Sequence, residues 1–155
     1  MEKGFKCEHC RSFVSVTKFV GTAHRNHCPF CLWSKHIDQK FAGDRKAACL
    51  GLMEPVGLTF KEEGKDKYGK IIQGELMVVS RCVLCYKFSI NRIAADDEPK
   101  AILELFEKSL KIEKDLPAGR QGLKKELEKM GIRLLKEEDR EEIKVQLFGK
   151  EQLVN

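Results

Sequence analysis

The sequence predicts a small α+β protein in which short β-hairpins precede a helical C-terminal extension, and three observations carry that prediction. Short apolar segments flank cysteine pairs that share the spacing Cys-x-x-Cys, namely Cys7/Cys10, Cys28/Cys31 and Cys82/Cys85. All seven cysteines and all four histidines precede Asp97. After that residue the chain is rich in Leu, Lys and Glu at helical spacing. We therefore expect two parts, residues 1–97 and residues 98–155, the second mainly helical.

The first and third cysteine pairs are expected at the tips of β-hairpins. The apolar run Leu76–Val79 leads into the third pair, and Phe88–Ile90 leaves it with the alternation of a strand. The first pair is flanked in the same way, by Phe5 on one side and Phe13–Val14 on the other. Each pair should therefore sit on a turn between two short strands.

A loop is expected before the third pair, and a helix is expected at the start of the C-terminal part. Residues 61–70 combine many charges with two glycines, which indicates an exposed loop between Leu58–Phe60 and Ile71–Ile72. Further on, Asp96, Asp97 and Pro99 resemble a helix start, with an acidic cap candidate and then a proline where its missing N–H is not needed. The apolar residues that follow at helical spacing are Ile102, Leu105, Phe106 and Leu110.

The C-terminal part should contain two more helices. The breakers of the first helix are Pro117, Gly119 and Gly122. Helical spacing then resumes at Leu123, Leu127 and Met130. Gly131 is a plausible helix end, Ile132–Leu135 resembles a short strand, and Glu138–Phe148 resembles a last helix.

Composition indicates the cellular compartment but not the partner. No run of about eighteen apolar residues is present, and the first residues lack the apolar stretch of a secretory signal, so we expect a cytoplasmic protein with no membrane partner. An odd number of cysteines in a reducing compartment argues against a disulfide framework. The formal net charge of +5 would fall to about +2 with seven thiolates and two divalent ions, so charge alone does not identify a partner.

The cysteine count predicts two bound zinc ions. A Cys-x-x-Cys turn offers two thiolates to one ion, which suits tetrahedral zinc with Zn–S bonds of roughly 2.3 Å. Two closed tetrahedral sites need eight ligands, and seven cysteines plus one histidine supply them. Thiolate-rich sites with four protein ligands are usually structural, because the thiolates leave the ion a weak Lewis acid.

Loop closure favours neighbours as partners in each site. The first site would then hold Cys7, Cys10, Cys28 and Cys31. The second would hold Cys49, Cys82, Cys85 and His36. We favour His36 because it lies between the first site and Cys49, but His24 or an open fourth position could take its place. A crossed arrangement, in which Cys82 and Cys85 join an earlier pair, also stays open.

Several motifs in the first part of the chain resemble one known family. The stretch His24–Leu32 contains the letters RNHCP, and Gly43–Arg45 and Gly51–Pro55 follow in order. The last cysteine pair and Asn91–Ala94 extend the likeness, so that the residues from Phe5 to Asp97 resemble the RNHCP-domain family. The resemblance implies a small zinc-ribbon-like domain of a bacterial or archaeal type, and the family has no assigned biochemical activity.

Two features depart from this family resemblance or from ordinary zinc knuckles. Glycine commonly follows the second cysteine of a knuckle, whereas this chain has Arg11, Leu32 and Tyr86 there. The backbone at those turns is therefore expected to be less relaxed. Residues 98–155 lie outside the resemblance and form an addition to it.

Five polar residues at expected knuckle edges and loops are candidate nucleic-acid contacts, namely Arg25, Asn26, Arg45, Asn91 and Arg92. Arginine binds phosphate in a bidentate fork and stacks on bases, and asparagine can read a base edge. The competing interpretation, which the sequence leaves open, pairs these arginines with aspartates inside the domain. Trp33 and Phe30 are expected in the core rather than as stacking platforms.

Three function classes follow from these patterns. The favoured one is a zinc-binding module with structural metals that contacts nucleic acid, either structured RNA or the ribosome. The alternative is a protein-interaction adaptor whose helical extension binds a partner through Leu105 or Leu127. A zinc-dependent hydrolase is third, since it would need a site with an exchangeable water.

Overall fold

The computed structural model describes residues 4–16, 27–36, 48–61, 64–70, 74–114 and 121–149. The strands are β1 (Gly4–Lys6), β2 (Phe13–Ser15), β3 (Ser34–Lys35), β4 (Leu52–Phe60), β5 (Leu76–Cys82) and β6 (Phe88–Arg92). The helices are α1 (Pro99–Lys114), α2 (Gln121–Lys129), the short 3-10 helix η2 (Glu137–Asp139) and α3 (Arg140–Phe148). The predicted small α+β fold with a helical C-terminal part is confirmed.

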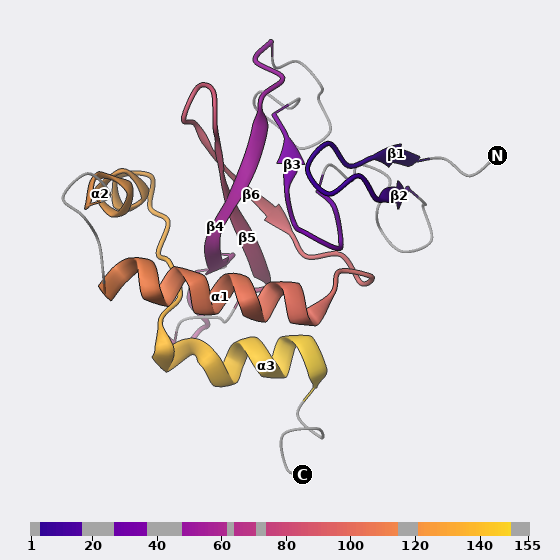
Figure 1. Cartoon of the computed structure of the whole chain (residues 1–155). Coiled ribbons are helices and arrows are strands. Elements are labelled where there is room, and N and C mark those ends of the chain that lie inside the picture. Colours follow the sequence, from indigo (N-terminus) through magenta and orange to yellow (C-terminus); the bar gives the residue numbers. More distant parts are fainter. Residues whose placement is uncertain are drawn as a thin grey trace.

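Both predicted hairpins form, each with a cysteine pair at its tip. Strands β1 and β2 pair antiparallel as a separate sheet, with Phe5 opposite Val14. The second sheet is antiparallel with the order β3-β4-β5-β6, and its β5–β6 hairpin carries the third cysteine pair. In Figure 1 the β1–β2 hairpin lies at one end of the long β4–β5 ribbon, and α1 and α3 lie at the other end.

The main hydrophobic core lies between one face of this sheet and the helices α1 and α3. Because side chains alternate along a strand, Leu58, Leu76 and Val78 share that face. The predicted stripe on α1 meets them, and Ile102 and Phe106 are fully buried. Ile143 of α3 completes the cluster, which therefore combines residues from both sides of Asp97.

A second cluster lies on the opposite face of the sheet. Val79 points away from Val78 and packs with Leu127 of α2 and Ile132. Leu134 also packs against this cluster and approaches the backbone of β4 at Gly57. The approach requires glycine, because a Cβ there would lie 2.7 Å from a methyl carbon of Leu134. The two faces are thus covered by different parts of the C-terminal extension.

The end of α2 follows the expected pattern. Gly131 has a φ of 74°, a conformation that glycine adopts without strain. The Ile132 N–H donates to the Leu127 carbonyl at 2.9 Å, and the Gly131 N–H donates to Glu128 at 3.0 Å. These two bonds and the packing of Ile132 on Leu127 form a Schellman motif.

Two local expectations were wrong. Gly122 lies inside α2 instead of before it. Ile132–Leu135 forms no strand; the Leu135 N–H donates to the Leu58 carbonyl at 2.9 Å, and the Thr59 hydroxyl donates to the Arg133 carbonyl at 2.7 Å. A side-chain contact therefore takes the place of the next ladder bond, and the segment runs along β4 without joining the sheet.

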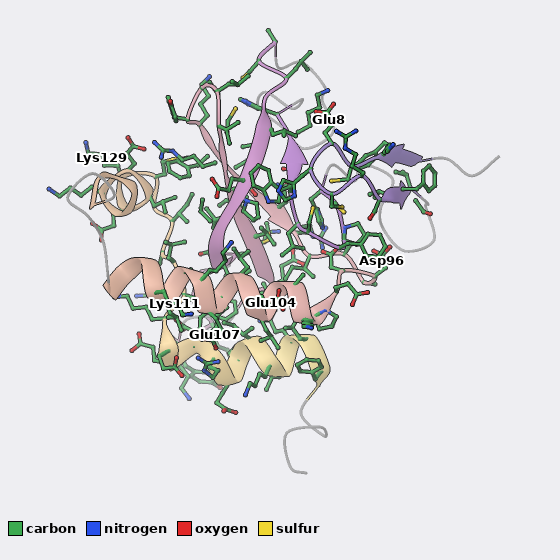
Figure 2. The ribbon with its side chains drawn as sticks, in the orientation of Figure 1. Glu8, Asp96, Glu104, Glu107, Lys111 and Lys129 are labelled. Atoms are coloured by element: carbon green, nitrogen blue, oxygen red, sulfur yellow. The ribbon has the colours of Figure 1, made fainter. Side chains whose placement is uncertain are left out.

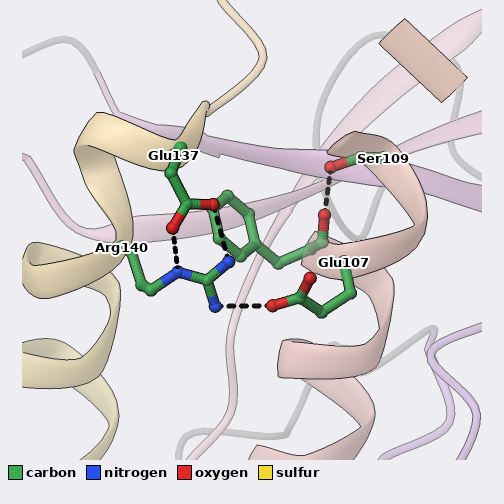
Figure 3. Close-up of polar contacts among 5 residues, drawn as sticks. Glu107, Ser109, Glu137 and Arg140 are labelled. Atoms are coloured by element: carbon green, nitrogen blue, oxygen red, sulfur yellow. Dashed lines mark hydrogen bonds and ion pairs between the residues drawn. The ribbon is translucent and has the colours of Figure 1, made fainter. Parts of the chain in front are cut away.

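Arg140 joins α3 to α1. Its guanidinium donates to the carboxylates of Glu137 and Glu107, as Figure 3 shows. It also lies 5.1 Å from the ring centroid of Phe106. Hydrogen bonds to Glu137 and Glu107 raise the pKa of Arg140.

The outer surface of α1 carries charged side chains, including Glu104 and Lys111 (Figure 2). None of the described helices is both long and apolar enough to cross a membrane.

Candidate metal centres

The structure brings four cysteine sulfurs together beside the β1–β2 hairpin. The Sγ atoms of Cys7, Cys10, Cys28 and Cys31 all lie within 4.8 Å of one another. Cys7 and Cys31 approach to 3.6 Å, and so do Cys10 and Cys28. Tetrahedral zinc with bonds of roughly 2.3 Å would separate its sulfurs by roughly 3.8 Å. The group therefore has the size and the chemistry that fit one zinc ion.

A second group lies where β3, β4 and the β5–β6 hairpin meet. It consists of His36, Cys49, Cys82 and Cys85, whose ligand atoms also lie within 4.8 Å of one another. The sulfurs of Cys49 and Cys82 are 3.6 Å apart, and His36 Nδ1 is 3.3 Å from the Cys85 sulfur. This grouping is the one that loop closure favoured, and His36 is its histidine. His24, the alternative histidine, lies outside the described residues.

The three cysteine pairs have the same backbone structure. In each, the N–H of the first cysteine donates to the carbonyl two residues after the second cysteine, and the N–H one residue after the second donates back to the first. For Cys7 these partners are Ser12 and Arg11, at 2.9 Å each. The corresponding partners are Trp33 and Leu32 for Cys28, and Lys87 and Tyr86 for Cys82. We call each such unit a knuckle.

His36 and Cys49 form a fourth knuckle that sequence analysis missed. The His36 N–H donates to Gly51 at 2.8 Å, and the Leu50 N–H donates to His36 at 3.1 Å, which is the same pattern of bonds. Residues 37–48 stand here in place of the usual two, so the spacing motif is lost. Gly51 is required because a Cβ there would lie 2.9 Å from the Cys82 sulfur.

Backbone strain marks all four knuckles. Among the described residues, the non-glycine residues with positive φ are Arg11, Leu32, Leu50 and Tyr86, with values of 56° to 68°. Each directly follows the second ligand of a knuckle. An L-residue in this conformation costs about 1–2 kcal/mol, so the less relaxed backbone expected at three of these positions is present. The strain recurs where the chain must turn around a ligand group.

Backbone N–H groups point at ligand sulfurs in all three cysteine pairs. The donors are Cys10 to Cys7 at 3.5 Å, Phe30 to Cys28 at 3.4 Å, and Cys85 to Cys82 at 3.5 Å. Hydrogen bonds of this kind stabilise a thiolate more than a thiol. The backbone therefore prepares these sulfurs to carry negative charge.

The thiol pKa values divide within each group. Burial raises the pKa of Cys28 to about 11 and also raises that of Cys31. Burial acts the same way on Cys10, but hydrogen bonds, chiefly from Ser12, outweigh it and lower the pKa to about 6. Burial would also raise the pKa of Cys82, but hydrogen bonds, chiefly from the backbone of Cys85 and Leu84, outweigh it and lower that pKa to about 6. Neighbouring thiolates repel, so a divalent cation would let all the thiols of a group lose their protons together.

Polar contacts anchor the first group to the rest of the fold. Buried His27 and Asp97 share a hydrogen bond of 2.7 Å between Nε2 and Oδ2, next to Cys28 and the start of α1. The side chain of Glu8, labelled in Figure 2, accepts from Lys35 at 2.8 Å. His9 stacks on Trp33 with 4.0 Å between ring centroids. Trp33 is half-buried, whereas Phe30 is 50% exposed, so its expected place in the core was wrong.

The candidate nucleic-acid residues are only partly described. Arg25, Asn26 and Arg45 lie outside the described residues. Asn91 is half-buried, and its amide donates to the Ser89 hydroxyl at 3.5 Å. Arg92 is exposed and pairs with Glu75 at 2.9 Å. The structure does not bring Asn91 or Arg92 into either ligand group.

The comparisons identify a family for this chain. No curated protein and no solved structure matches it. The family model of the RNHCP domain matches residues 2–103, a segment that contains both ligand groups and ends within α1. The chain therefore belongs to the RNHCP domain family.

Proposed function

We propose that this protein is a module in which two structural zinc ions hold a surface that binds nucleic acid, with structured RNA or a ribonucleoprotein as the favoured partner. Residues 1–97 would carry the zinc ligands and the contacts, and residues 98–155 would support them as a helical extension. Because cysteine thiolates persist in a reducing compartment, a cytoplasmic location fits this role.

The ligand sets favour structural metals. Each group offers four protein ligands, seven of the eight being cysteines. Four ligands fill a tetrahedral site and leave no position for a reactive water, which a zinc hydrolase needs. The zinc ions, when bound, would supply cross-links between knuckles that are far apart in the sequence.

The outer face of the β1–β2 hairpin carries the nucleic-acid proposal. Lys6 and Phe13 are direct cross-strand partners and therefore share that face. The Phe13 ring is 51% exposed and lies over Gly4, where a Cβ would be 2.7 Å from the ring. Arg11, in the adjoining knuckle, is also exposed. An exposed ring beside cations on a rigid hairpin is the arrangement that stacks on a base while it attracts phosphate.

The five polar candidates remain proposed contacts in addition to the hairpin face. Arg92 presents an exposed guanidinium whose partner Glu75 a phosphate could replace. Asn91 precedes it on β6. Arg25, Asn26 and Arg45 are proposed contacts on the basis of sequence alone.

The adaptor alternative loses its proposed contact residues. Leu105 and Leu127 are both buried, in the main core and in the second cluster respectively. A partner could reach these side chains only if the helices left the sheet. Protein binding through them is therefore less well supported than nucleic-acid binding through the hairpin.

Salt-dependent RNA binding tests the proposal. A labelled RNA hairpin with an unpaired loop should bind the zinc-loaded protein more weakly at about 200 mM than at about 50 mM salt. The double variant Lys6→Ala/Phe13→Ala should bind more weakly, and Lys65→Ala, in the exposed loop, is the matched control. If wild-type protein shows no salt-dependent affinity for RNA, the nucleic-acid proposal is wrong.

A further inference from the structure

Three side chains of the β5–β6 hairpin, Arg81, Tyr86 and Phe88, form a column next to the cysteines of the second ligand group. Arg81 on β5 and Phe88 on β6 are cross-strand partners, and the Arg81 guanidinium carbon lies 5.5 Å from the Phe88 ring centroid. The same carbon lies 4.9 Å from the ring centroid of Tyr86. The Tyr86 side chain is 60% exposed, so one end of the column faces solvent.

Tyr86 is an unexpected residue at its position. Its φ of 64° favours glycine, and it directly follows the second cysteine of the third knuckle. A strained position with a large side chain is understandable when that side chain is buried, as Leu32 is at the equivalent position. Arg11 and Leu50 are exposed at their equivalent positions, as Tyr86 is. Tyr86 differs from both in presenting an aromatic ring that a guanidinium contacts.

Arg81 restrains the Tyr86 ring on one face, and a backbone hydrogen bond fixes the residue that carries it. The Tyr86 N–H donates to the Cys82 carbonyl at 3.1 Å, which ties it to a ligand of the second group. Arg81 in turn lies 3.9 Å from the Glu126 carboxylate of α2. The buried Nε of Arg81 has no hydrogen-bond partner among the described residues. A fixed ring loses little entropy when another ring stacks on it.

Two cations flank the column, Arg81 and Lys87, and two carboxylates lie near Arg81, namely Glu126 and its cross-strand partner Glu54 on β4. Arg81 is about one-third exposed at its side chain, and Lys87, next to Tyr86, is exposed. Base-stacking rings flanked by cations are typical of proteins that bind single-stranded segments, because each base has a face that can stack whatever its identity. A paired base in the middle of a helix has no free face.

We propose that Tyr86 is a stacking platform for an unpaired nucleobase. The protein would then recognise single-stranded or looped RNA at the third knuckle as well as at the β1–β2 hairpin. This inference rests on the proposed nucleic-acid function and specifies the feature that is bound. Stacking extends the column from Phe88 through Arg81 and Tyr86 to the base, and Lys87 lies near the phosphate that follows it. Exposed Leu84 and Val83 at the tip of the same knuckle offer apolar contact to the sugar or to the base edge.

Three variants of Tyr86 separate the effect of the ring on binding from its effect on folding. Tyr86→Gly removes the ring and relieves the positive φ, so its thermal stability should not fall. Tyr86→Leu keeps an apolar side chain and the strain but has no ring, and Tyr86→Phe keeps the ring. The control is Tyr68→Ala, which removes the other tyrosine of the chain, itself exposed and close to the cation of Lys67.

Binding is measured by fluorescence anisotropy of the zinc-loaded full chain with a labelled single strand of about ten uridines and with a blunt RNA duplex of the same length. Tyr86→Gly and Tyr86→Leu should weaken single-strand binding on the order of tenfold and change duplex binding little. Tyr86→Phe and Tyr68→Ala should bind as wild type does.

Three results would overturn the inference, and they differ in what they leave standing. If wild type binds the single strand and Tyr86→Gly binds it equally well, the platform is wrong while the proposed function stands. An equal loss on both probes would show a general contact with the backbone instead of stacking. Wild-type protein that binds neither probe refutes both proposals, and the exposed tip of the third knuckle would then favour a protein partner.

Discussion

One residue directly follows the second ligand of each knuckle. Replacing it with glycine should raise the free energy of unfolding at some knuckles and lower it at others. The four residues there have φ between 56° and 68°. An L-residue costs about 1–2 kcal/mol in this conformation. Glycine removes that cost but makes the unfolded chain more flexible, which offsets about 0.4–1 kcal/mol of the gain. Where the side chain makes few contacts, the glycine variant should therefore be more stable by roughly 0.5–1 kcal/mol.

Burial of the side chain decides the sign. Leu50 is 53% exposed, so Leu50→Gly should show most of that net gain. Leu32 is 1% exposed and belongs to the main core cluster. Loss of a buried leucine side chain costs about 2–5 kcal/mol, which exceeds the relief of strain. We expect Leu32→Gly to be less stable by about 2–4 kcal/mol.

Urea unfolding of the zinc-loaded protein, followed by circular dichroism, measures both effects. Leu50→Ala is the matched control, because it removes the same side chain and keeps the strain, so it should be less stable than Leu50→Gly. The reasoning is refuted if Leu50→Gly and Leu32→Gly shift the unfolding midpoint in the same direction. It also fails if Leu50→Gly is no more stable than Leu50→Ala.

Three further predictions concern the metals, pH and the core. Elemental analysis of purified protein should find two zinc ions per chain, and Cys82→Ser should lower the tightly bound content to one; an unchanged ratio would contradict the second ligand group. Burial alone would raise the pKa of Asp139, but hydrogen bonds from Arg133 and Lys136 outweigh it and lower the pKa below 3.8. The stability that this carboxylate contributes is therefore present above pH 3.8 and is lost as the pH falls through the lowered pKa. The difference in stability between wild type and Asp139→Asn should accordingly shrink on acidification. Phe106→Ala should cost about 3–5 kcal/mol by urea unfolding, because the ring is fully buried, whereas Phe148→Ala, at a partly exposed position, should cost much less.

Local signals in the sequence were enough for the hairpins and for α1. The strands around Cys7/Cys10 and Cys82/Cys85 follow from short apolar segments on both sides of a tight turn, and all these residues are near neighbours in the chain. Pro99 begins α1, and its apolar stripe needs only a period of 3.6 residues. The grouping of the ligands followed from loop closure, which is also set by distance along the chain.

Features that depend on distant partners were not predictable. Ile132–Leu135 has the composition of a strand, but its hydrogen bonds depend on where β4 ends its pairing with β3. The fourth knuckle was hidden because residues 37–48 separate its two ligands, although its backbone bonds equal those of the others. Phe30 was expected inside by residue type, but it lies between two ligands on a turn that points outward.

Residues 1–97 and residues 98–155 stabilise opposite ends of the β4–β5 ribbon. Strand β5 begins at Leu76, in the core under α1, and ends at Cys82, a ligand of the second group. The family match ends at residue 103, yet Phe106, Leu127 and Ile143, which lie beyond it, are fully buried. Without these side chains the matched segment would lose most of the cover on both faces of the sheet. A domain that small buries little apolar surface of its own. Bound metal cannot replace that cover, because it cross-links the knuckles only at the far end of the strands.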